Sequence, residues 1–142
     1  MKSSDANTGG WLFKEEPTHY SFADLQRDST TWWDGVENNL ARKNLRNVKA
    51  GDRVLYYHTG KERAIVGEMR VLTGPRPDPA LEDPKAVVVE VQFVRSWPKP
   101  VTLERIKQEA LLQSWDLVRL PRLSVMPVSP NQWQRLEELG GV

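Results

Sequence analysis

Two adjacent side chains of opposite charge, Lys14 and Glu15, stand at the end of the first apolar run of the chain. Buried together in one cavity, they would shift each other's pKa values and could act as an acid–base pair. Neighbours on a strand point to opposite faces of the sheet, so only one of them enters a given cavity unless the strand ends there. Pro17 predicts such an ending. The pair is therefore compatible with catalysis and with binding.

A second group combines aromatic and basic side chains. Trp33 precedes a segment, residues 42–53, with five positive charges and one negative charge, and Tyr57 and His58 follow it. Aromatic rings offer stacking surfaces to nucleobases, and Lys and Arg contact phosphates. In the alternative interpretation, Trp33 and Tyr57 belong to the core and the basic residues form a solvated helix face. The residues expected to face phosphates are Arg42, Lys43 and Arg46.

Residue counts and missing motifs exclude several classes of site. The chain has no cysteine and two histidines, which rules out disulfides, thiolate chemistry, cysteine zinc sites and a three-histidine metal site. It contains no Gly-x-Ser-x-Gly elbow and no phosphate-binding glycine run, so neither serine hydrolysis nor nucleotide hydrolysis is supported. We expect no cofactor and no metal. A net charge of +1 also excludes binding of polyanions by bulk charge alone.

Length and composition fit one globular domain. The 142 residues are 39% hydrophobic and 27% charged, which is typical of a folded domain. No run approaches the roughly 18 apolar residues of a membrane span, and the first residues lack the apolar core of a signal peptide. We expect a monomer in a reducing compartment, which is the cytoplasm, or the nucleus in a eukaryote. Tryptophan is unusually frequent, at Trp11, Trp32, Trp33, Trp97, Trp115 and Trp133.

Turn, cap and periodicity signals predict the elements that would position these residues. Residues 1–10 are polar and predict a flexible arm, followed by a single domain over 11–142. Strands are expected over 11–14, 53–59, 64–72, 86–97 and 123–128, and helices over 22–27, 40–47, 102–112 and 130–139. Four prolines within residues 74–84 predict an irregular excursion, and Gly67 predicts a bulge or a close backbone approach. Without βαβ alternation the fold class is α+β, with a small curved sheet or partly closed barrel.

Five motifs resemble those of EVE-domain proteins, in the family's order. They are residues 11–21 (WL-x-K-x-EP…YS), 33–42 (W-x-GVRNYQAR), 51–58 (GD-x-V-x-x-YH), 100–103 (PVTL) and 122–128 (RLSVxPV). The resemblance implies a PUA-like fold. In such a fold a small mixed or antiparallel curved sheet forms a pseudo-barrel of about five to six strands with short flanking helices.

The resemblance also implies a pocket between the barrel and the basic helix that accepts a nucleobase, such as modified cytosine in DNA or RNA. The chain would then be a non-catalytic nucleic-acid reader. Trp33 would stack on the base, while Asn38 and backbone groups near Val36 would bind its edge. The implied pocket residues are Lys14, Glu15, Trp33, Gly35, Val36, Asn38, Asn39, Tyr57, His58, Arg122, Leu123 and Ser124.

The implied pocket departs from the family pattern at one place. Where that pattern has Arg-Asn-Tyr-Gln, this chain has Glu37, Asn38, Asn39 and Leu40. Glu37 replaces a donor with an anion that repels a nucleic-acid backbone. Asn39 removes a stacking surface worth roughly 1–3 kcal/mol per base. We therefore expect modest selectivity and weak binding to duplexes.

Two other classes of function remain open. ASCH-type relatives of this fold suggest an amidohydrolase acting on a modified cytidine through Lys14 and Glu15, although the sequence shows no third partner beside them. A small-molecule sensor or interaction module fits the balanced charge and Glu37. If Trp33 stacks on a ligand, Trp33→Ala should weaken binding by about 1–3 kcal/mol and hardly lower thermal stability. A large loss of stability would instead place Trp33 in the core.

Overall fold

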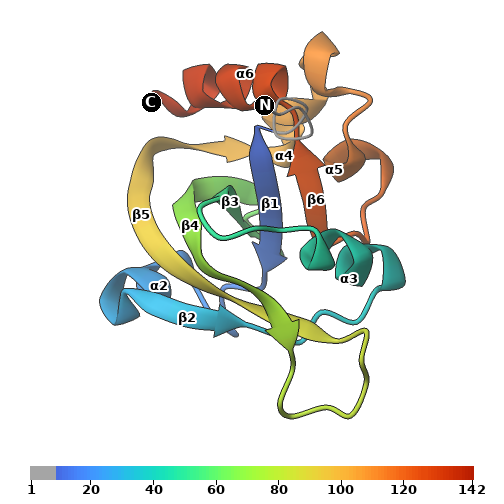
Figure 1. Ribbon diagram of the computed structural model, residues 1–142. Coiled ribbons are helices and arrows are strands. Elements are labelled where there is room, and N and C mark those ends of the chain that lie inside the picture. The colour runs from blue at the N-terminus through green and yellow to red at the C-terminus, as the bar shows by residue number, and fades with distance from the viewer. Residues whose placement is uncertain (1–8) are drawn as a thin grey trace.

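Six strands form one mixed sheet in the computed structural model, which describes residues 9–142. They are β1 (Gly10–Glu15), β2 (Thr30–Trp33), β3 (Arg53–His58), β4 (Ala64–Pro77), β5 (Val87–Thr102) and β6 (Val125–Val128). Their order is β2-β5-β4-β3-β1-β6, with β1 and β3 parallel and the other neighbouring pairs antiparallel. The sheet curves into a pseudo-barrel that stays open between β2 and β6 (Figure 1). The predicted α+β fold is confirmed.

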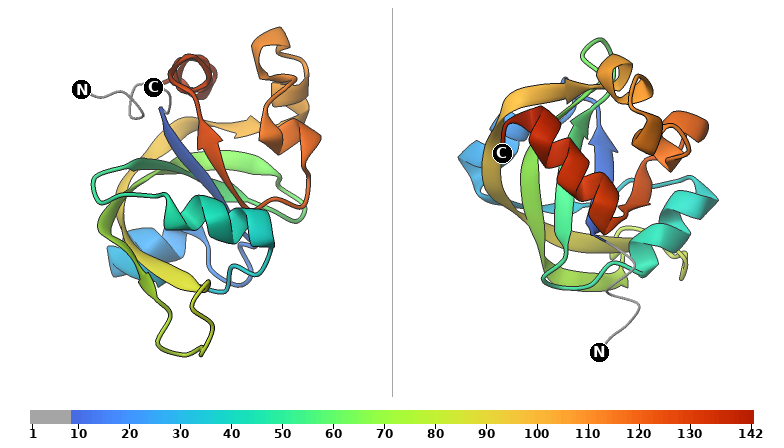
Figure 2. Two further views of the ribbon diagram at one scale, coloured as in Figure 1. Left: turned by 45° about the vertical axis from the view of Figure 1, so that its right-hand side comes forward. Right: turned by 90° about the horizontal axis from the view of Figure 1, so that it is seen from above.

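Short helices cover the ends of this sheet. They are α2 (Phe22–Asp28), α3 (Asn39–Arg46), α4 (Leu103–Lys107), the 3-10 turn η1 (Ala110–Leu112), α5 (Asp116–Arg119) and α6 (Pro130–Gly140). Figure 2 shows α6 lying across one end of the barrel. None of the helices in the described part of the chain is long and apolar enough to cross a membrane.

The predicted helix starts are confirmed. Ser21 and Ser129 form capping boxes, with Asp24 and Gln132 as the reciprocal partners. The side chain of Asn38 accepts the N–H of Ala41 at the start of α3, and Thr102 caps α4 in the same way. These side chains satisfy N–H groups that the first helical turn leaves without partners.

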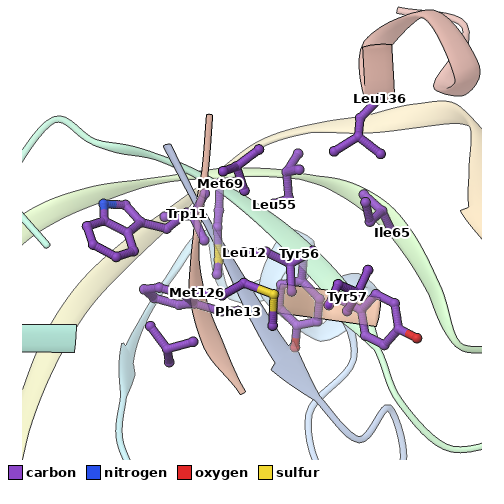
Figure 3. Close-up of a cluster of buried hydrophobic side chains, with 14 of the residues drawn as sticks. Trp11, Leu12, Phe13, Leu55, Tyr56, Tyr57, Ile65, Met69, Met126 and Leu136 are labelled. Carbon is purple, nitrogen blue, oxygen red and sulfur yellow. The ribbon is translucent and has the colours of Figure 1, made fainter. Parts of the chain in front are cut away.

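The inside of the barrel is aromatic. The Trp33 ring lies 5.4 Å from Phe13 and 5.4 Å from Tyr56, measured between centroids. Phe22 lies 5.1 Å from Tyr56 and 5.0 Å from Phe93. Figure 3 shows Phe13 and Tyr56 within a larger buried cluster, to which Leu12, Leu55, Met69 and Met126 also belong. This cluster is the rigid base for the groups at the ends of β1 and β2.

Two strands run further than the sequence predicts. Instead of ending near residues 72 and 97, β4 continues to Pro77 and β5 to Thr102. The register of β4 against β5 shifts between Ile65 and Gly67. A bulge of β5 over residues 97–100 thereby takes up two prolines that could not pair in a regular ladder.

Other elements differ from the prediction because of tertiary contacts. β2 was not expected, and it pairs antiparallel with β5 from Thr30 opposite Gln92 to Trp33 opposite Val89. The single helix expected over 102–112 is split into α4 and η1, and α5 was not expected. The chain turns inward there to bury Trp115, whose Nε1 donates to the carbonyl of Pro127 at 3.0 Å.

The start of the domain also differs slightly from the prediction. Gly10 already belongs to β1, and the N–H of Gly9 donates to the carbonyl of Val128, the last residue of β6. The remainder of the predicted flexible arm, residues 1–8, lies outside the described residues.

Gly67 combines both features predicted for it. It lies at the register shift between β4 and β5. A Cβ atom there would collide with the Phe22 ring and lie 2.7 Å from the carbonyl oxygen of Arg95. Because the Phe22 ring is packed in the core and the Arg95 carbonyl belongs to the backbone of β5, neither can move at low cost.

Gly67→Ala should therefore lower the free energy of unfolding by about 1–3 kcal/mol, the usual range for overpacking a core. Gly74→Ala is the matched control on the same strand, because its Cβ would meet its nearest atom, the Ala50 nitrogen, at 3.7 Å. Urea unfolding of both variants gives the comparison. Equal stability of the two would show that the close approach of Phe22 is not a real constraint.

Candidate functional site

Two cavities open beside the end of β1, where the predicted residues gather. The indole cavity has a volume of about 240 Å³ and is lined by Glu15, His19, Tyr20, Thr31, Trp32, Trp33 and Asp34. The apolar cavity has a volume of about 300 Å³ and is lined by Asn38, Leu40, Arg119, Leu120, Pro121, Arg122 and Leu123. Both volumes are at or below the small end of the range for ligand pockets, which fits a small planar group.

The loop between β2 and α3 links the two cavities. Asp34, directly after β2, lines the indole cavity, and Asn38, directly before α3, lines the apolar cavity. A larger cavity of about 370 Å³ lies between the β3–β4 hairpin and α4, and it contains none of the predicted site residues. The sequence-derived site thus divides into two neighbouring parts.

Lys14 supplies a cationic donor beside the apolar cavity. Its Nζ donates to the carbonyl of Pro121 at 3.0 Å and lies 5.5 Å from the centroid of the Tyr57 ring. Burial lowers the pKa of Lys14 below its usual value of 10.5. Within residues 9–142 no carboxylate forms an ion pair with it. Because an ammonium carries three N–H donors, donors remain for a ligand.

Glu15 faces the other way, into the indole cavity. Its Oε2 accepts the N–H of Glu16 at 3.0 Å, and its Oε1 lies 3.2 Å from Nδ1 of His19. Lys14 and Glu15 therefore follow the alternation expected of a strand and do not share a cavity. The acid–base pair considered from the sequence is not formed by this arrangement.

The two adjacent tryptophans of β2 also point in opposite directions. Trp33 is 5% exposed and packs on Phe13 and Tyr56. Of the two alternatives considered for Trp33, this burial favours a place in the core, because the strand turns its side chain into the barrel. Trp32 is 39% exposed, and the guanidinium carbon of Arg76 lies 4.5 Å from its ring centroid. The accessible indole of this site is therefore that of Trp32, which is not among the pocket residues that the resemblance implied.

His58 and Tyr57 have mainly structural contacts. Nε2 of His58 accepts the N–H of Phe22 at 3.0 Å, and Nδ1 lies 2.6 Å from Oε1 of Glu62. An accepting Nε2 places the proton on Nδ1, so His58 acts as a neutral link that holds the first turn of α2. Tyr57 is 2% exposed, and burial raises the pKa of its phenol to about 12. Neither side chain lines either cavity.

The loop residues predicted to bind a base are partly committed to the fold. The carbonyl of Val36 accepts Nε of Arg42 at 2.7 Å. Oδ1 of Asn38 accepts the N–H of Ala41 at 2.9 Å, so its amide NH₂ group is the part left for a ligand. Gly35 has a φ of +73°, which favours glycine. Asn39 is exposed and lines neither cavity.

The predicted phosphate contacts are corrected in one case. The side chain of Arg42 is 17% exposed and is held by the Val36 carbonyl and by Asp83, whose Oδ2 lies 2.9 Å from Nη1. Its guanidinium is thus turned inward, where it stabilises the loop before α3 through the Val36 carbonyl. Lys43 is exposed, and Arg46 is exposed with one bond to the carbonyl of Lys85.

The last predicted motif lies at the apolar cavity. Arg122 is exposed at its rim and Leu123 is buried in its wall. The carbonyl of Ser124 accepts the backbone N–H of Lys14 at 2.9 Å, so this motif holds the end of β1. Sequence reasoning missed Arg119 and Leu120, because it predicted no element over α5. Within residues 9–142, no three His, Asp or Glu side chains group in a way that could hold a metal ion.

Comparisons with known proteins agree with one another. The family model described as the EVE domain matches residues 10–139. Thymocyte nuclear protein 1 of Gallus gallus is 30% identical over 175 residues, covering 93% of this chain and 72% of the relative. The crystal structure of a Pseudomonas putida protein is 36% identical with a TM-score of 0.86, covering 92% of this chain and 98% of that chain.

One similar structure contains a ligand. The human THYN1 protein in complex with 5-methylcytosine containing DNA is 29% identical, with a TM-score of 0.85, and covers 93% of this chain and 97% of that chain. A more distant likeness is to the ASCH protein of Zymomonas mobilis, at 11% identity and a TM-score of 0.57. This second likeness shows the fold alone, and it agrees with the PUA-like architecture implied by the sequence motifs.

The opposite orientations of the two tryptophans predict opposite effects on stability. Trp33→Ala should lower the free energy of unfolding by about 3–5 kcal/mol, because it empties a packed site in the core. Trp32→Ala removes a ring that is largely in solvent and should change it by about 0.5 kcal/mol or less. Urea unfolding measures both. A small effect of Trp33→Ala would restore its assignment as a ligand platform.

Burial of Lys14 predicts a pH dependence of stability. Its pKa is lowered in the folded chain and is about 10.5 when unfolded. Between these two values the unfolded state binds more protons, so stability rises with pH there. The difference in unfolding free energy, wild type minus Lys14→Met, should therefore increase as the pH approaches 10.5 and level off above it. Lys99→Met, at an exposed position, is the control, and an equal slope for it would contradict the burial of Lys14.

Proposed function

Because the chain belongs to the EVE-domain family, we propose that it binds DNA at a modified cytosine and catalyses no reaction there. One observation carries this proposal. The human THYN1 structure, similar over 93% of this chain, is a complex with 5-methylcytosine containing DNA. The contacts at the two cavities support the transfer of this property and favour one of them as the base pocket.

We place the base in the apolar cavity. Leucine and proline side chains form most of its lining, and such walls suit the faces of a base and a 5-methyl group. The amide NH₂ of Asn38 and the spare N–H groups of Lys14 are donors beside it. Cytosine has two acceptors on its pairing edge, O2 and N3. The donors of Asn38 and Lys14 therefore complement these two acceptors.

The rim of this cavity is basic. Arg119 and Arg122 both line it and are exposed. Arg119 has a 3.4 Å contact with Asp116, whereas Arg122 has no hydrogen bond or ion pair within the described part of the chain. Guanidinium groups at such a rim can bind phosphates on either side of an inserted base. These two residues take the place that the sequence assigned to Arg42.

The same geometry favours binding over catalysis. An amidohydrolase acting through Lys14 and Glu15 would need both groups at one scissile bond. Instead, Lys14 is bonded to Pro121 beside the apolar cavity and Glu15 lines the indole cavity. No observation on this chain favours the catalytic alternative.

The proposal is tested with labelled oligonucleotides in a fluorescence anisotropy titration. Single-stranded DNA with one 5-methylcytosine should bind about fourfold more tightly than the same strand with cytosine, since a buried methyl contributes about 0.8 kcal/mol. Lys14→Met should weaken binding about tenfold or more, because it removes a charged hydrogen bond of about 1.5–3 kcal/mol. Lys99→Met removes the same charge away from both cavities and should bind like the wild type.

Four results would contradict the proposal. If all strands bind with equal affinity and this affinity falls as the salt concentration rises, binding is due to phosphate attraction alone. Tighter binding to the matching RNA would move the function to RNA. Turnover of an acylated cytidine, lost in Lys14→Ala, would make the chain an enzyme. Binding of a free heterocycle without any oligonucleotide would indicate a small-molecule sensor.

A further inference from the structure

Trp32 differs from the other five tryptophans of the chain, all of which lie in the described part. Its side chain is 39% exposed, whereas the others are 7% exposed or less. It lies on β2, an edge strand of the sheet, and lines the indole cavity. A single exposed aromatic is common on protein surfaces. Its position at the mouth of a cavity beside the proposed base pocket is what distinguishes it.

Arg76 is the second component of this surface. Its guanidinium carbon lies 4.5 Å from the centroid of the Trp32 ring. The sheet produces this contact, because Trp32 pairs with Glu90 and Arg76 with Val88 on the same strand, β5. Among residues 9–142 the Arg76 guanidinium has no hydrogen bond or ion pair. Its five N–H donors are therefore free to bind an anion.

The side chains around the Trp32 ring carry charges of both signs, and each sign favours a different part of a nucleotide. Glu15 and Asp34 line the indole cavity, and their carboxylates accept hydrogen bonds from amino groups but repel phosphates. Arg76 stands over the ring and attracts phosphates. A nucleotide that places its base toward the cavity and its phosphate toward Arg76 satisfies both. A free anion or an acidic peptide would meet the carboxylates unfavourably.

We propose that Trp32 and Arg76 form a second nucleotide subsite. The Trp32 indole stacks on a base next to the modified cytosine, and Arg76 binds the phosphate of that nucleotide. This inference rests on the proposed function and deepens it. An indole reaches the face of a base only where the base is not stacked in a duplex. The preferred ligand is therefore single-stranded DNA.

The test uses single-stranded DNA carrying one 5-methylcytosine, with its neighbouring positions either normal or abasic. On the normal strand, Trp32→Ala should weaken binding about 5- to 150-fold, the loss expected for one stacked base. On the strand with abasic neighbours, the wild type and Trp32→Ala should bind equally. Trp32→Phe keeps an aromatic ring and should recover most of the affinity.

Arg76 is tested by the salt dependence of binding. Arg76→Ala should reduce the slope of log affinity against log salt by about 0.7, the value for one phosphate contact on a single strand. Arg70→Ala, an exposed arginine of the same strand β4, should keep the wild-type slope. Equal slopes for Arg76→Ala and the wild type would overturn the phosphate contact.

Acrylamide quenching gives a readout independent of affinity. In the free protein the accessible fluorescence should come mainly from Trp32, and it should be absent in Trp32→Phe. Saturating single-stranded DNA should protect it. Unprotected fluorescence, or equal affinity of Trp32→Ala and the wild type on the normal strand, would overturn the subsite while leaving the base pocket intact. Failure of the wild type to bind any strand would overturn both proposals.

Discussion

The parallel pairing of β1 with β3 is the constraint on which the rest of the structure depends. It places Lys14 beside Tyr57 and Glu15 beside His58, so two motifs more than 40 residues apart end at the same edge of the sheet. Parallel strands require a long connection that returns the chain to its starting end. Here that connection carries α2, β2 and α3, and it brings the loop after β2 to the edge where β1 ends. Both cavities are built at that meeting point.

The aromatic interior then decides which groups remain accessible. Phe13, Trp33 and Tyr56 fill the barrel below the cavities. The carbonyl of Tyr20 accepts the Tyr56 hydroxyl, and His58 holds the first turn of α2. These contacts hold the start of α2 against β3, and β1 is fixed in turn by its pairing with β3 and by the bond from the Lys14 N–H to the Ser124 carbonyl. Lys14 and Glu15 are thus presented in opposite directions by a rigid strand, an arrangement suited to recognition.

Much of the fold could be predicted from local signals. A few adjacent residues determine the capping boxes of Ser21 and Ser129 and the bulge at Gly67, and each is confirmed. The direction of Arg42 could not be predicted, because it depends on Asp83, a residue 41 positions away. The orientations of Trp32 and Trp33 could not be predicted either, since they depend on β2 forming a strand. Burial of a tryptophan is a tertiary property that its sequence neighbours do not encode.

The energetics of such a site favour recognition through several weak contacts over recognition by a single tight pocket. A methyl group alone gives about fourfold discrimination, and extruding a base from a duplex costs a few kcal/mol. One stacked base and two or three hydrogen bonds of about 1 kcal/mol each barely exceed that cost. In a single strand the extrusion cost is small, so the same contacts become net affinity. In the proposed complex, Arg122 at one cavity and Arg76 beside the other would add phosphate contacts that the small net charge of +1 does not reveal. Local placement of charge, rather than its total, therefore determines what this surface can hold.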